Sequence, residues 1–510
     1  GTGEAPLGSG RVSFYVTTPI YYVNGEPHLG HAYSTIAADI LARHHRQRGE
    51  DVFFLTGTDE HGEPVVQQAE AEDVTPRELG DRLAPRFKEL AAKIDASNDF
   101  FIRTTDDGHM KRVQEIVQRV HDNGHVYEGM YEGWYCPRCA DFKTQSEIGP
   151  DNTCPIHRIP LTREEQRNWF FRLSSFQGEL ERLYEKRRDF VVPDFRRNEA
   201  LSFIKQGLQD VSLSRPTLKW GVPVPWDPDQ VIYVWFDALL NYYTALGYGV
   251  EGKDVTERFW PPFHILAKDI LKFHAVYWPA FLMAAKIEVP RRMFIHGYLL
   301  MEGHKMSKSL GNVLDPDEVI AKFGADALRF YCFREVSFGQ DGQISPAGFE
   351  ARYETELADQ YGNLANRVLS MIGRYRDGTV PGAEAETELA RDFEGVPDRV
   401  RALLDEAELT QALEEIWKLV RRLNQYVEET KPWELAKDDT ASERLDAVLY
   451  GLAEGLRVTT LLVHSYMPET TGRLLEALGE PGRELAEFGD RRGGQALGEL
   501  DPLFPKLQVA

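Results

Sequence analysis

Apolar runs along the first quarter of the chain predict strands joined by helices. Residues 12–18 are β-branched and aromatic, which predicts a buried strand, and residues 51–55 predict a second strand. Between them apolar residues recur at helical spacing, as at Ile36 and Ile40. Strand and helix patterns continue to alternate over residues 12–118, which predicts the start of a parallel sheet.

This alternation breaks in the next hundred residues. Residues 119–229 hold cysteines and short aromatic segments, and they end in the Pro-dense stretch 220–228. The α/β pattern resumes with the apolar run 230–235. We therefore predict one domain built from residues 12–118 and 230–300, split by an inserted domain at 119–229.

The last third of the chain has no strand pattern. From about residue 350 onward we find amphipathic helices, with Leu364, Val368 and Ile372 as one apolar stripe. Residues 380–386 predict a loop between two helices. We expect a helical domain at residues 356–510.

The charge balance restricts the partners that the chain can bind. It carries 59 Lys and Arg against 81 Asp and Glu, a formal net charge of −22. This acidity argues against indiscriminate binding of nucleic acid, because affinity for phosphates needs positive surface. An RNA partner would have to meet local basic patches. The candidates are Arg196 with Arg197, Lys418 with Arg421 and Arg422, and Arg367 with Arg374 and Arg376.

The sequence predicts a cytoplasmic protein. No apolar run approaches the roughly 20 residues that span a bilayer. Residues 1–11 are rich in glycine and lack the apolar segment of a signal peptide, so we expect a flexible tail there. Three of the four cysteines cluster near a histidine, which is unlike a disulfide framework.

A lysine-rich segment at residues 303–312, here called the lysine loop, suggests polyphosphate binding. It holds Lys305, Ser307 and Lys308 between glycines. Two lysines three residues apart can bracket the phosphates of a nucleotide as point charges. By itself the segment could equally be a solvated basic turn.

A pair of histidines near the start supports the nucleotide interpretation. His28, Gly30 and His31 stand between the first predicted strand and the following helix. A helix N-terminus presents unpaired backbone N–H groups and favours phosphate oxygens, and a glycine lets the nucleotide approach closely. The imidazoles can donate hydrogen bonds to a phosphate as charge develops. An isolated pair would more often be a metal site or surface histidines.

Four residues of the predicted insertion have the spacing of a zinc site. Cys136 and Cys139 are followed after fourteen residues by Cys154 and His157. Three thiolates and an imidazole make a closed tetrahedral site, which is structural rather than catalytic. The alternative is a set of unpaired buried thiols. Cys332 lies between aromatic residues and is predicted to be a small core residue.

Residues 28–31 and 305–309 resemble the two signature motifs of the class I aminoacyl-tRNA synthetases, and the finer resemblance is to the methionyl-tRNA synthetase family. It extends over nearly the whole chain. Further matching segments are 22–25, 57–62, 234–238, 268–270, 273–274, 338–342 and 431–433. Ala267 and Leu239 differ from a glycine and a proline that are found in parts of the family, which leaves the detail of the pocket open.

The resemblance implies a fold and a set of site residues. The fold is α/β: a Rossmann-like parallel-sheet catalytic domain split by a zinc-binding insertion, then residues 301–355 with the lysine loop and a region contacting the tRNA stem, then an all-α helical bundle. Catalysis falls to His28, His31, Lys305 and Lys308, with Gly30, Asp269 and Ser307 also at ATP. The implied methionine site is Ile20, Tyr22, Asp59, Trp235, Ala238, Tyr242, Ile270, Phe273, His274 and Trp278, and the implied anticodon contacts are Asn363, Arg367, Pro432 and Trp433.

Several of these residues have plainer explanations when each is taken alone. The aromatic residues would then be ordinary core, Asp59 could cap a helix, and Asn363 with Arg367 could be a solvated helix face. In its implied role the Asp59 carboxylate would hold the substrate ammonium group, and the aromatic walls would suit a polarizable thioether.

The expected activity is that of a methionine–tRNA ligase of protein biosynthesis. The resemblance implies that L-methionine and ATP form methionyl-adenylate and pyrophosphate, with Mg²⁺ present, and that methionine then passes to the 3′-terminal ribose of tRNA(Met). The alternatives are another class I synthetase, for leucine, isoleucine, valine or cysteine, and a catalytically silent tRNA-binding homologue. We expect a monomer, because no additional C-terminal dimerisation domain follows the helical domain in this sequence.

Overall fold

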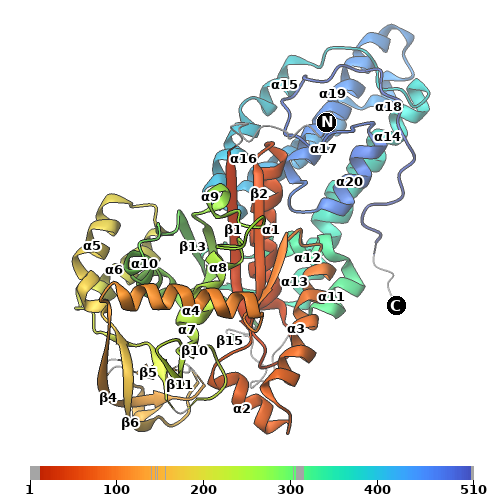
Figure 1. Ribbon diagram of the computed structural model, residues 1–510. Helices are drawn as coiled ribbons and strands as arrows, with labels where there is room; N and C mark the ends of the chain where they lie inside the picture. Colours follow the sequence, from red (N-terminus) through yellow and green to blue (C-terminus); the bar gives the residue numbers. More distant parts are fainter. Residues whose placement is uncertain are drawn as a thin grey trace, which may run out of the picture.

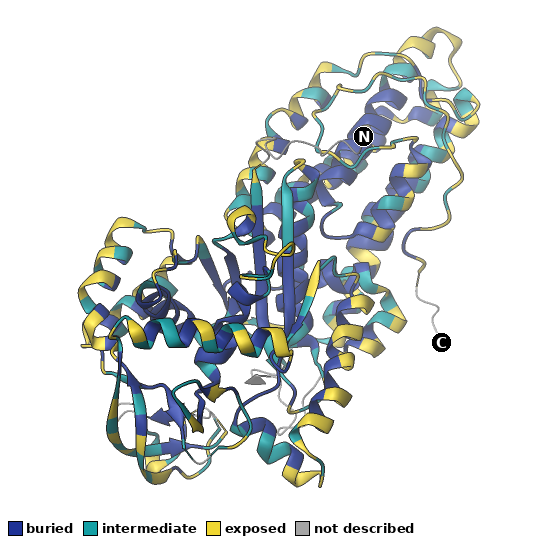
Figure 2. Ribbon diagram, in the orientation of Figure 1, coloured by how far each residue is buried: buried dark blue, intermediate teal, exposed yellow. Residues whose placement is uncertain are grey.

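The structure is a computed structural model that describes residues 12–138, 141–143, 145, 147–155, 157–216, 218–301, 304–305 and 315–506. Figure 1 shows a central parallel sheet, a second lobe beside its lower end and an elongated helical lobe at the upper right. Buried residues follow the strands of the central sheet and the long helices (Figure 2). Among the described helices, none combines the length and the apolar composition that crossing a bilayer requires.

A six-stranded sheet forms the centre of the fold. Its strand order is β3-β2-β1-β12-β13-β7, and all neighbouring strands are parallel. The chain moves outward from β1 to β3 and then returns to β12, so its direction across the sheet reverses between β1 and β12. The strands are β1 (Ser13–Tyr22), β2 (Asp51–Asp59), β3 (Phe100–Arg103), β7 (Val191–Val192), β12 (Phe263–Ala267) and β13 (Arg292–His296).

Helices connect the strands of this sheet. The alternation confirms the predicted α/β fold, because buried parallel strands need crossover connections that cover them. The helices are α1 (Leu29–Gln47), α2 (Glu63–Ala71), α3 (Pro76–Lys93), α4 (Asp107–Asp122), α7 (Val234–Leu239), α8 (Asn241–Thr244), α9 (Thr256–Phe259), η3 (Lys268–Ile270), the π-helix η4 (Phe273–Tyr277) and α10 (Trp278–Ala284).

The region between α4 and α7 forms two small antiparallel sheets with short helices. One sheet has the order β5-β4-β6-β8 and is built on the long β4–β6 ladder, and the other has the order β10-β11-β9. The elements are β4 (Val126–Cys136), β5 (Asp141–Lys143), η1 (Pro150–Asn152), β6 (Thr162–Phe171), η2 (Leu173–Phe176), α5 (Gln177–Lys186), α6 (Asp194–Lys205), β8 (Val211–Ser212), β9 (Ser214–Arg215), β10 (Pro223–Val224) and β11 (Asp227–Ile232).

Two strands differ from the sequence-based expectation. The apolar run 230–235 does not re-enter the parallel sheet: β11 pairs antiparallel with β9 and β10, and α7 begins at Val234. The Pro-dense stretch before it folds back as a strand beside β11, and the main sheet resumes only at β12. Conversely β7, from the range expected to be wholly inserted, is the edge strand beside β13. An apolar run predicts that a segment is buried, but it does not show which sheet the segment joins.

A short connecting region follows the main sheet. Strands β15, β14 and β16 form a small sheet, and helices then lead into the helical lobe. The elements are β14 (Leu299–Met301), β15 (His304–Lys305), α11 (Pro316–Phe323), α12 (Ala325–Glu335), β16 (Gly342–Gln343), α13 (Pro346–Arg352) and the π-helix η6 (Tyr353–Gly362).

The helical lobe packs around the long helices α17 and α19. Its helices are α14 (Asn363–Arg376), α15 (Thr387–Phe393), α16 (Val396–Asp405), α17 (Leu409–Thr430), α18 (Pro432–Leu435), η7 (Asp439–Ala441), α19 (Ser442–Val463) and α20 (Pro468–Ala477). Beyond Leu478 the described chain, to residue 506, forms neither helix nor extended strand; one isolated bridge joins Ala496 to Thr379. Several glycines and Pro481 in this stretch disfavour a continued helix.

Helix α1 connects the central sheet to the helical lobe. Near its C-terminal end, Gln47 donates from Nε2 to the carbonyl oxygens of Leu461 and Arg483 at 3.0 and 2.7 Å. In its middle, the buried Asp39 carboxylate lies 2.7 Å from the buried guanidinium of Arg329, which also donates to the carbonyl oxygen of Tyr466 at 2.8 Å. These polar contacts fix the helix to α12 and to the helical lobe.

Candidate functional site

The predicted site residues gather at the carboxyl edge of the parallel sheet. Tyr22 and Asp59 are the last residues of β1 and β2, and Asp269 follows β12 in η3. The N-terminus of α1 lies at the same edge, because α1 begins shortly after β1 ends. In open α/β sheets ligands bind outside the carboxyl ends of the strands, where the connections reverse direction. Here that point lies between β1 and β12.

The two histidines form a reciprocal cap at the start of α1. His28 is the N-cap residue, and its Nδ1 accepts from the Gly30 backbone N–H at 3.0 Å. The Nδ1 of His31 accepts from the His28 backbone N–H at 3.0 Å, and the two rings stack with centroids 3.9 Å apart. A neutral imidazole whose Nδ1 accepts carries its proton on Nε2. Both rings are thereby set to donate from Nε2.

Gly30 is required by this cap. A Cβ atom on Gly30 would lie 2.8 Å from Cε1 and 3.0 Å from Nδ1 of the His28 ring. The first turn of α1 also contains no acidic residue, so the positive end of the helix dipole is not cancelled locally. The site therefore combines imidazole donors with an anion-attracting helix end.

The lysine loop is only partly within the described chain. Lys305 belongs to β15, which pairs antiparallel with β14 in the register Leu300 to Lys305. Strand β14 follows β13, and His296 at the end of β13 lies 2.7 Å from the Ser34 hydroxyl of α1. The start of the loop is thus tied to the carboxyl edge of the sheet. Ser307 and Lys308, like Gly303, lie outside the described residues.

The predicted methionine site centres on stacked aromatic rings. The rings of Trp235 and Phe273 stack with centroids 3.8 Å apart and planes 6° apart. The buried His274 donates from Nδ1 to the Ile270 carbonyl at 3.0 Å, so its Nε2 accepts from the Tyr242 hydroxyl at 2.8 Å. Burial lowers the pKa of His274 to about 4, which keeps the ring neutral near pH 7. The wall is therefore aromatic and uncharged.

The other predicted methionine-site residues occupy two depths. Ile20, Tyr22 and Ile270 are partly buried and pack against the same core as Trp235, and Ala238 is buried in α7. Trp278 is fully buried, with its ring centroid 6.0 Å from that of Tyr242. Its Nε1–H donates to His264 Nε2 at 3.1 Å. Trp278 therefore supports Tyr242 from the core.

A buried charge network, which sequence reasoning missed, lies beside Asp59. The Asp237 carboxylate accepts from His61 Nδ1 at 2.6 Å and from His109 Nε2 at 2.7 Å, and Thr244 Oγ1 lies 2.7 Å from His109 Nδ1. Burial opposes ionisation, but the two histidines lower the pKa of Asp237 to about 2. The His61 backbone N–H also donates to Asp59 at 3.4 Å.

Asp59 itself is held in an environment that resists its ionisation. Burial, and after it the neighbouring Asp237 carboxylate, raise the pKa of Asp59 well above its usual value. A carboxylate under this constraint gains most from a bound cation, because a positive charge relieves both burial and repulsion. The environment suits a substrate ammonium group.

Asp269 stands on the opposite side of the reversal point in the sheet. It lies in η3 directly after β12, and its charge influences His274, His296 and Tyr298. Burial, and after it Asp269, raise the pKa of Tyr298 above its usual value. The adjacent Lys268 forms an ion pair with Asp341 at 2.6 Å, which joins η3 to the segment before β16.

Three of the four predicted metal ligands come together in the inserted region. The ligand atoms of Cys136, Cys154 and His157 all lie within 4.8 Å of one another, with His157 Nδ1 3.9 and 3.7 Å from the two sulfur atoms. Ligands on one tetrahedral zinc ion are separated by about 3.5–3.8 Å, so this donor set fits zinc. Cys139 lies outside the described residues. Cys332 is a buried core residue, as predicted.

The structure brings two of the predicted anticodon residues together. The guanidinium carbon of Arg367, on α14, lies 5.9 Å from the centre of the Trp433 ring, and Arg367 Nη2 forms an ion pair with Glu428 at 2.8 Å. Asn363 is exposed one turn before Arg367, and Pro432 is buried at the start of α18. A partly exposed indole beside a guanidinium is suited to stacking with an unpaired base.

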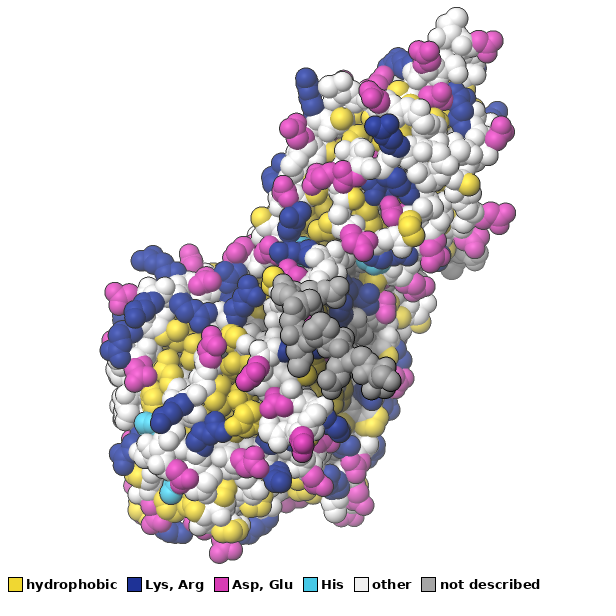
Figure 3. Space-filling view, turned by 45° about the horizontal axis from the view of Figure 1, so that its top comes forward, with side chains coloured by type: hydrophobic (Ala, Val, Ile, Leu, Met, Phe, Trp, Pro, Cys, Tyr) yellow, Lys and Arg dark blue, Asp and Glu magenta, His cyan; other side chains and the backbone are white. Residues whose placement is uncertain are grey.

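Most of the candidate basic patches are balanced by acidic neighbours. Arg422 forms ion pairs with Asp392 and Glu429, at 2.6 and 3.0 Å, and Arg376 pairs with Asp446. Figure 3 shows Lys and Arg interspersed with Asp and Glu over the visible surface of the helical lobe. Arginines that are paired with carboxylates in this way leave less free positive charge for phosphates.

Known proteins resemble the chain over nearly its whole length. The family model for tRNA synthetases class I (M) matches residues 14–165 and 150–369. The methionine–tRNA ligase of Caldanaerobacter subterraneus subsp. tengcongensis is 43% identical over 508 residues, which span 98% of this chain and 80% of that protein. The methionine–tRNA ligase of Streptomyces coelicolor is 42% identical, and the alignment covers 98% of this chain and 97% of that protein.

Solved structures also resemble this chain over nearly its whole length. Mycobacterium tuberculosis methionyl-tRNA synthetase in complex with methionyl-adenylate superposes with a TM-score of 0.93 and 41% identity, over 97% of this chain and all of that one. The free state of the same synthetase gives a TM-score of 0.87 and 38% identity over 98% of this chain and 99% of that chain.

Proposed function

This chain belongs to the methionine–tRNA ligase family of class I aminoacyl-tRNA synthetases, and we propose that it converts L-methionine and ATP to methionyl-adenylate and then charges tRNA(Met). The observation that carries the proposal is the capped N-terminus of α1 beside the reversal point of the parallel sheet. That position suits a nucleotide phosphate, and the methionine-site residues lie at the same edge.

Adenylate formation needs alignment and charge stabilisation rather than a covalent enzyme intermediate. The methionine carboxylate attacks the α-phosphorus of ATP, and pyrophosphate leaves. The Nε2–H groups of His28 and His31 donate to phosphate oxygens as negative charge grows, because both Nδ1 atoms are occupied by backbone N–H groups. Lys305, Ser307 and Lys308 complete the phosphate contacts, with Mg²⁺ accompanying the triphosphate as part of the substrate.

Both small substrates are recognised at the carboxyl edge of the sheet. Asp59, at the end of β2, binds the ammonium group of methionine, and the stacked Trp235 and Phe273 rings contact its thioether. Asp269, after β12, accepts from the ribose hydroxyls of ATP, and Gly30 admits the nucleotide to the helix end. The neutral His274 keeps charge away from the methionine side chain.

The second step transfers methionine to RNA. A hydroxyl of the 3′-terminal ribose attacks the carbonyl carbon of the adenylate. An ester bond to the ribose forms, the bond between that carbon and the phosphate oxygen breaks, and AMP leaves. At the other end of the tRNA, Trp433 stacks on an unpaired anticodon base, while Asn363 and Arg367 contact base edges and Pro432 fixes the turn before α18. Residues 301–355, between the catalytic domain and the helical domain, contact the stem of the tRNA.

We assign the group Cys136, Cys154 and His157 to a structural zinc ion, with Cys139 as the fourth ligand. The distances among the three described ligands support this assignment. Such an ion would fix the turns at the tip of the inserted region. It takes no part in either chemical step.

The deciding experiment is pyrophosphate–ATP exchange with a panel of amino acids. The proposal expects exchange that depends on methionine, without tRNA, and weak or absent exchange with leucine, isoleucine, valine and cysteine. Exchange with one of the other amino acids would identify a different class I synthetase. Absence of exchange with every amino acid, together with tRNA binding, would instead indicate a catalytically silent homologue.

A further inference from the structure

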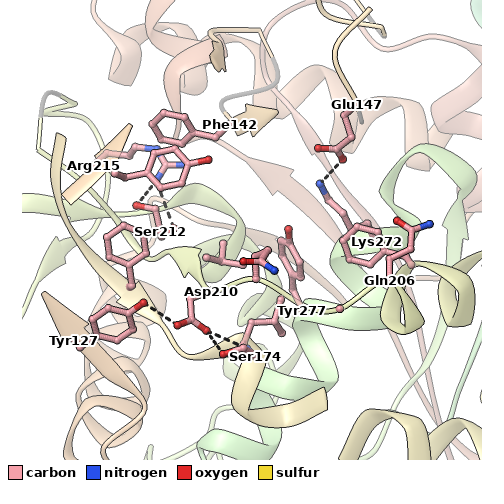
Figure 4. A pocket seen from close by; sticks show the side chains of 17 residues that line it. Tyr127, Phe142, Glu147, Ser174, Gln206, Asp210, Ser212, Arg215, Lys272 and Tyr277 are labelled. Carbon is pink, nitrogen blue, oxygen red and sulfur yellow. Dashed lines mark hydrogen bonds and ion pairs between the residues drawn. The ribbon is translucent and has the colours of Figure 1, made fainter. Parts of the chain in front are cut away.

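A cavity lies between the inserted region and η4. Its volume is about 620 Å³, and it opens between β4, β6 and β8 on one side and α6 and η4 on the other. Figure 4 shows side chains converging on it, among them Tyr127 of β4, Gln206 after α6, Arg215 of β9 and Tyr277 of η4. None of these residues belongs to the site described above.

The cavity is separated from the predicted methionine site by η4. Lys272, which lines the cavity, has its ammonium nitrogen 5.2 Å from the centre of the Phe273 ring and 5.6 Å from that of Tyr277. Phe273 stacks on Trp235 on the methionine side. A ligand in the cavity would therefore lie one aromatic layer from the bound amino acid.

Arg215 gives the cavity a buried positive charge that forms no ion pair within the described chain and interacts with the Glu63 carboxylate only at longer range. The residue is 4% exposed, and its Nη1 donates to the carbonyl oxygen of Ser214 at 3.0 Å and to the Ser212 hydroxyl at 3.1 Å. Within the described chain its Nε has no hydrogen-bond partner. A buried cation is costly unless acceptors surround it, so an acceptor supplied by a ligand would be stabilising.

The remaining walls are aromatic faces with a few fixed polar groups. Tyr127 and Phe170 stack with centroids 5.5 Å apart. The Asp210 carboxylate accepts from the Tyr127 hydroxyl at 2.7 Å and from the Ser174 hydroxyl at 2.6 Å, so these groups hold one another in place. Flat aromatic walls and a guanidinium match a flat heterocycle that carries carbonyl oxygens, as an unpaired nucleobase does.

We propose that this cavity receives an unpaired base from the acceptor end of the tRNA, with a base carbonyl toward Arg215 and the base plane against the aromatic walls. The inference rests on the proposed function, because tRNA is the substrate whose single-stranded end must reach the adenylate. Binding one base behind η4 would anchor that end next to the methionine site. The contact would strengthen charging without taking part in adenylate formation.

The test compares two phenylalanines of the same helix. Phe203, on α6, lines the cavity and is partly buried, whereas Phe195 on α6 is 45% exposed and does not line it. We expect Phe203→Ala to lower kcat/KM for tRNA roughly tenfold, since losing one stacked base commonly has such an effect. Methionine-dependent exchange without tRNA should stay within about twofold of wild type. Phe195→Ala should leave both reactions unchanged.

A double-mutant cycle identifies the occupant. Binding of intact tRNA and of tRNA lacking its unpaired 3′ nucleotides is measured with wild type and with Phe203→Ala. If the cavity holds one of those nucleotides, truncation should weaken binding to wild type far more than to the variant. Equal losses of binding to the two proteins would overturn the proposal and mean that the cavity binds a different ligand. Normal charging of tRNA by Phe203→Ala would overturn it as well. A wild-type protein without exchange activity would overturn the proposed function and this inference with it.

Discussion

Replacing Asp237 by Asn should destabilise the catalytic region by an amount that can be worked out from its surroundings. Its pKa of about 2 lies about two units below the usual value of 3.8, because the hydrogen bonds from His61 and His109 outweigh burial. Each pKa unit corresponds to about 1.4 kcal/mol, so the ionised carboxylate contributes about 2–3 kcal/mol to the free energy of unfolding at neutral pH. Asn keeps the shape and removes the charge.

The pH dependence gives this prediction a distinctive signature. The folded pKa is depressed, so the contribution is fully present well above pH 3.8 and is lost as the pH falls toward 2. The stability difference between wild type and Asp237→Asn should therefore be constant from pH 7 to about pH 5 and shrink below about pH 4. Urea unfolding followed by tryptophan fluorescence measures it. Equal stability at pH 7 would refute the reasoning, and so would a difference that stays constant down to pH 3.

The same substitution should change how methionine binding depends on pH. The Asp237 carboxylate helps to raise the pKa of Asp59, so its removal should lower the pKa of Asp59. If Asp59 must be ionised to hold the ammonium group, the acid limb of kcat/KM for methionine should move to lower pH in the variant, while KM for ATP stays unchanged. An unmoved acid limb in a folded variant would contradict the role proposed for Asp59.

Three further substitutions test other parts of the molecule. Gly30→Ala should lower methionine-dependent exchange roughly 100-fold with little change in KM for methionine, because the new Cβ displaces the His28 ring; near-normal exchange would argue against the capped histidines as phosphate donors. Trp433→Ala should weaken kcat/KM for tRNA by roughly 5- to 150-fold and spare exchange without tRNA; loss of both reactions would point to a folding role. Cys154→Ser should abolish zinc measured by metal analysis and speed proteolysis of the inserted region, and a wild-type protein free of zinc would refute the metal assignment.

The sequence predicted those features that depend on local patterns. The start of α1 directly after His28, the strands β1 and β2 and the helical lobe follow from apolar spacing within a few dozen residues. The aromatic pair Trp235 and Phe273 could be named from the family resemblance, but its stacked geometry needed the fold.

Features that depend on distant partners could not be predicted. His61 and His109 meet Asp237 across 176 and 128 residues of chain, so no local signal relates them. The basic patches had a similar limitation: Arg422 is adjacent in sequence to Arg421, yet its charge is balanced by Asp392 from another helix. Likewise β7 is too short to be recognised, and it gains its place only by pairing with β13.

Helix α1 can act as a lever, because one of its ends lies at the proposed phosphate site and the other contacts the helical lobe. Its nineteen residues give a length of about 28 Å, with His28 and His31, the proposed phosphate donors, at one tip and the hydrogen bonds from Gln47 at the other. Over that length a tilt of about 2° moves the tip by about 1 Å, a displacement that commonly costs an enzyme a large part of its rate. Small movements of the helical lobe on RNA binding would thus be transmitted mechanically to the reacting phosphate.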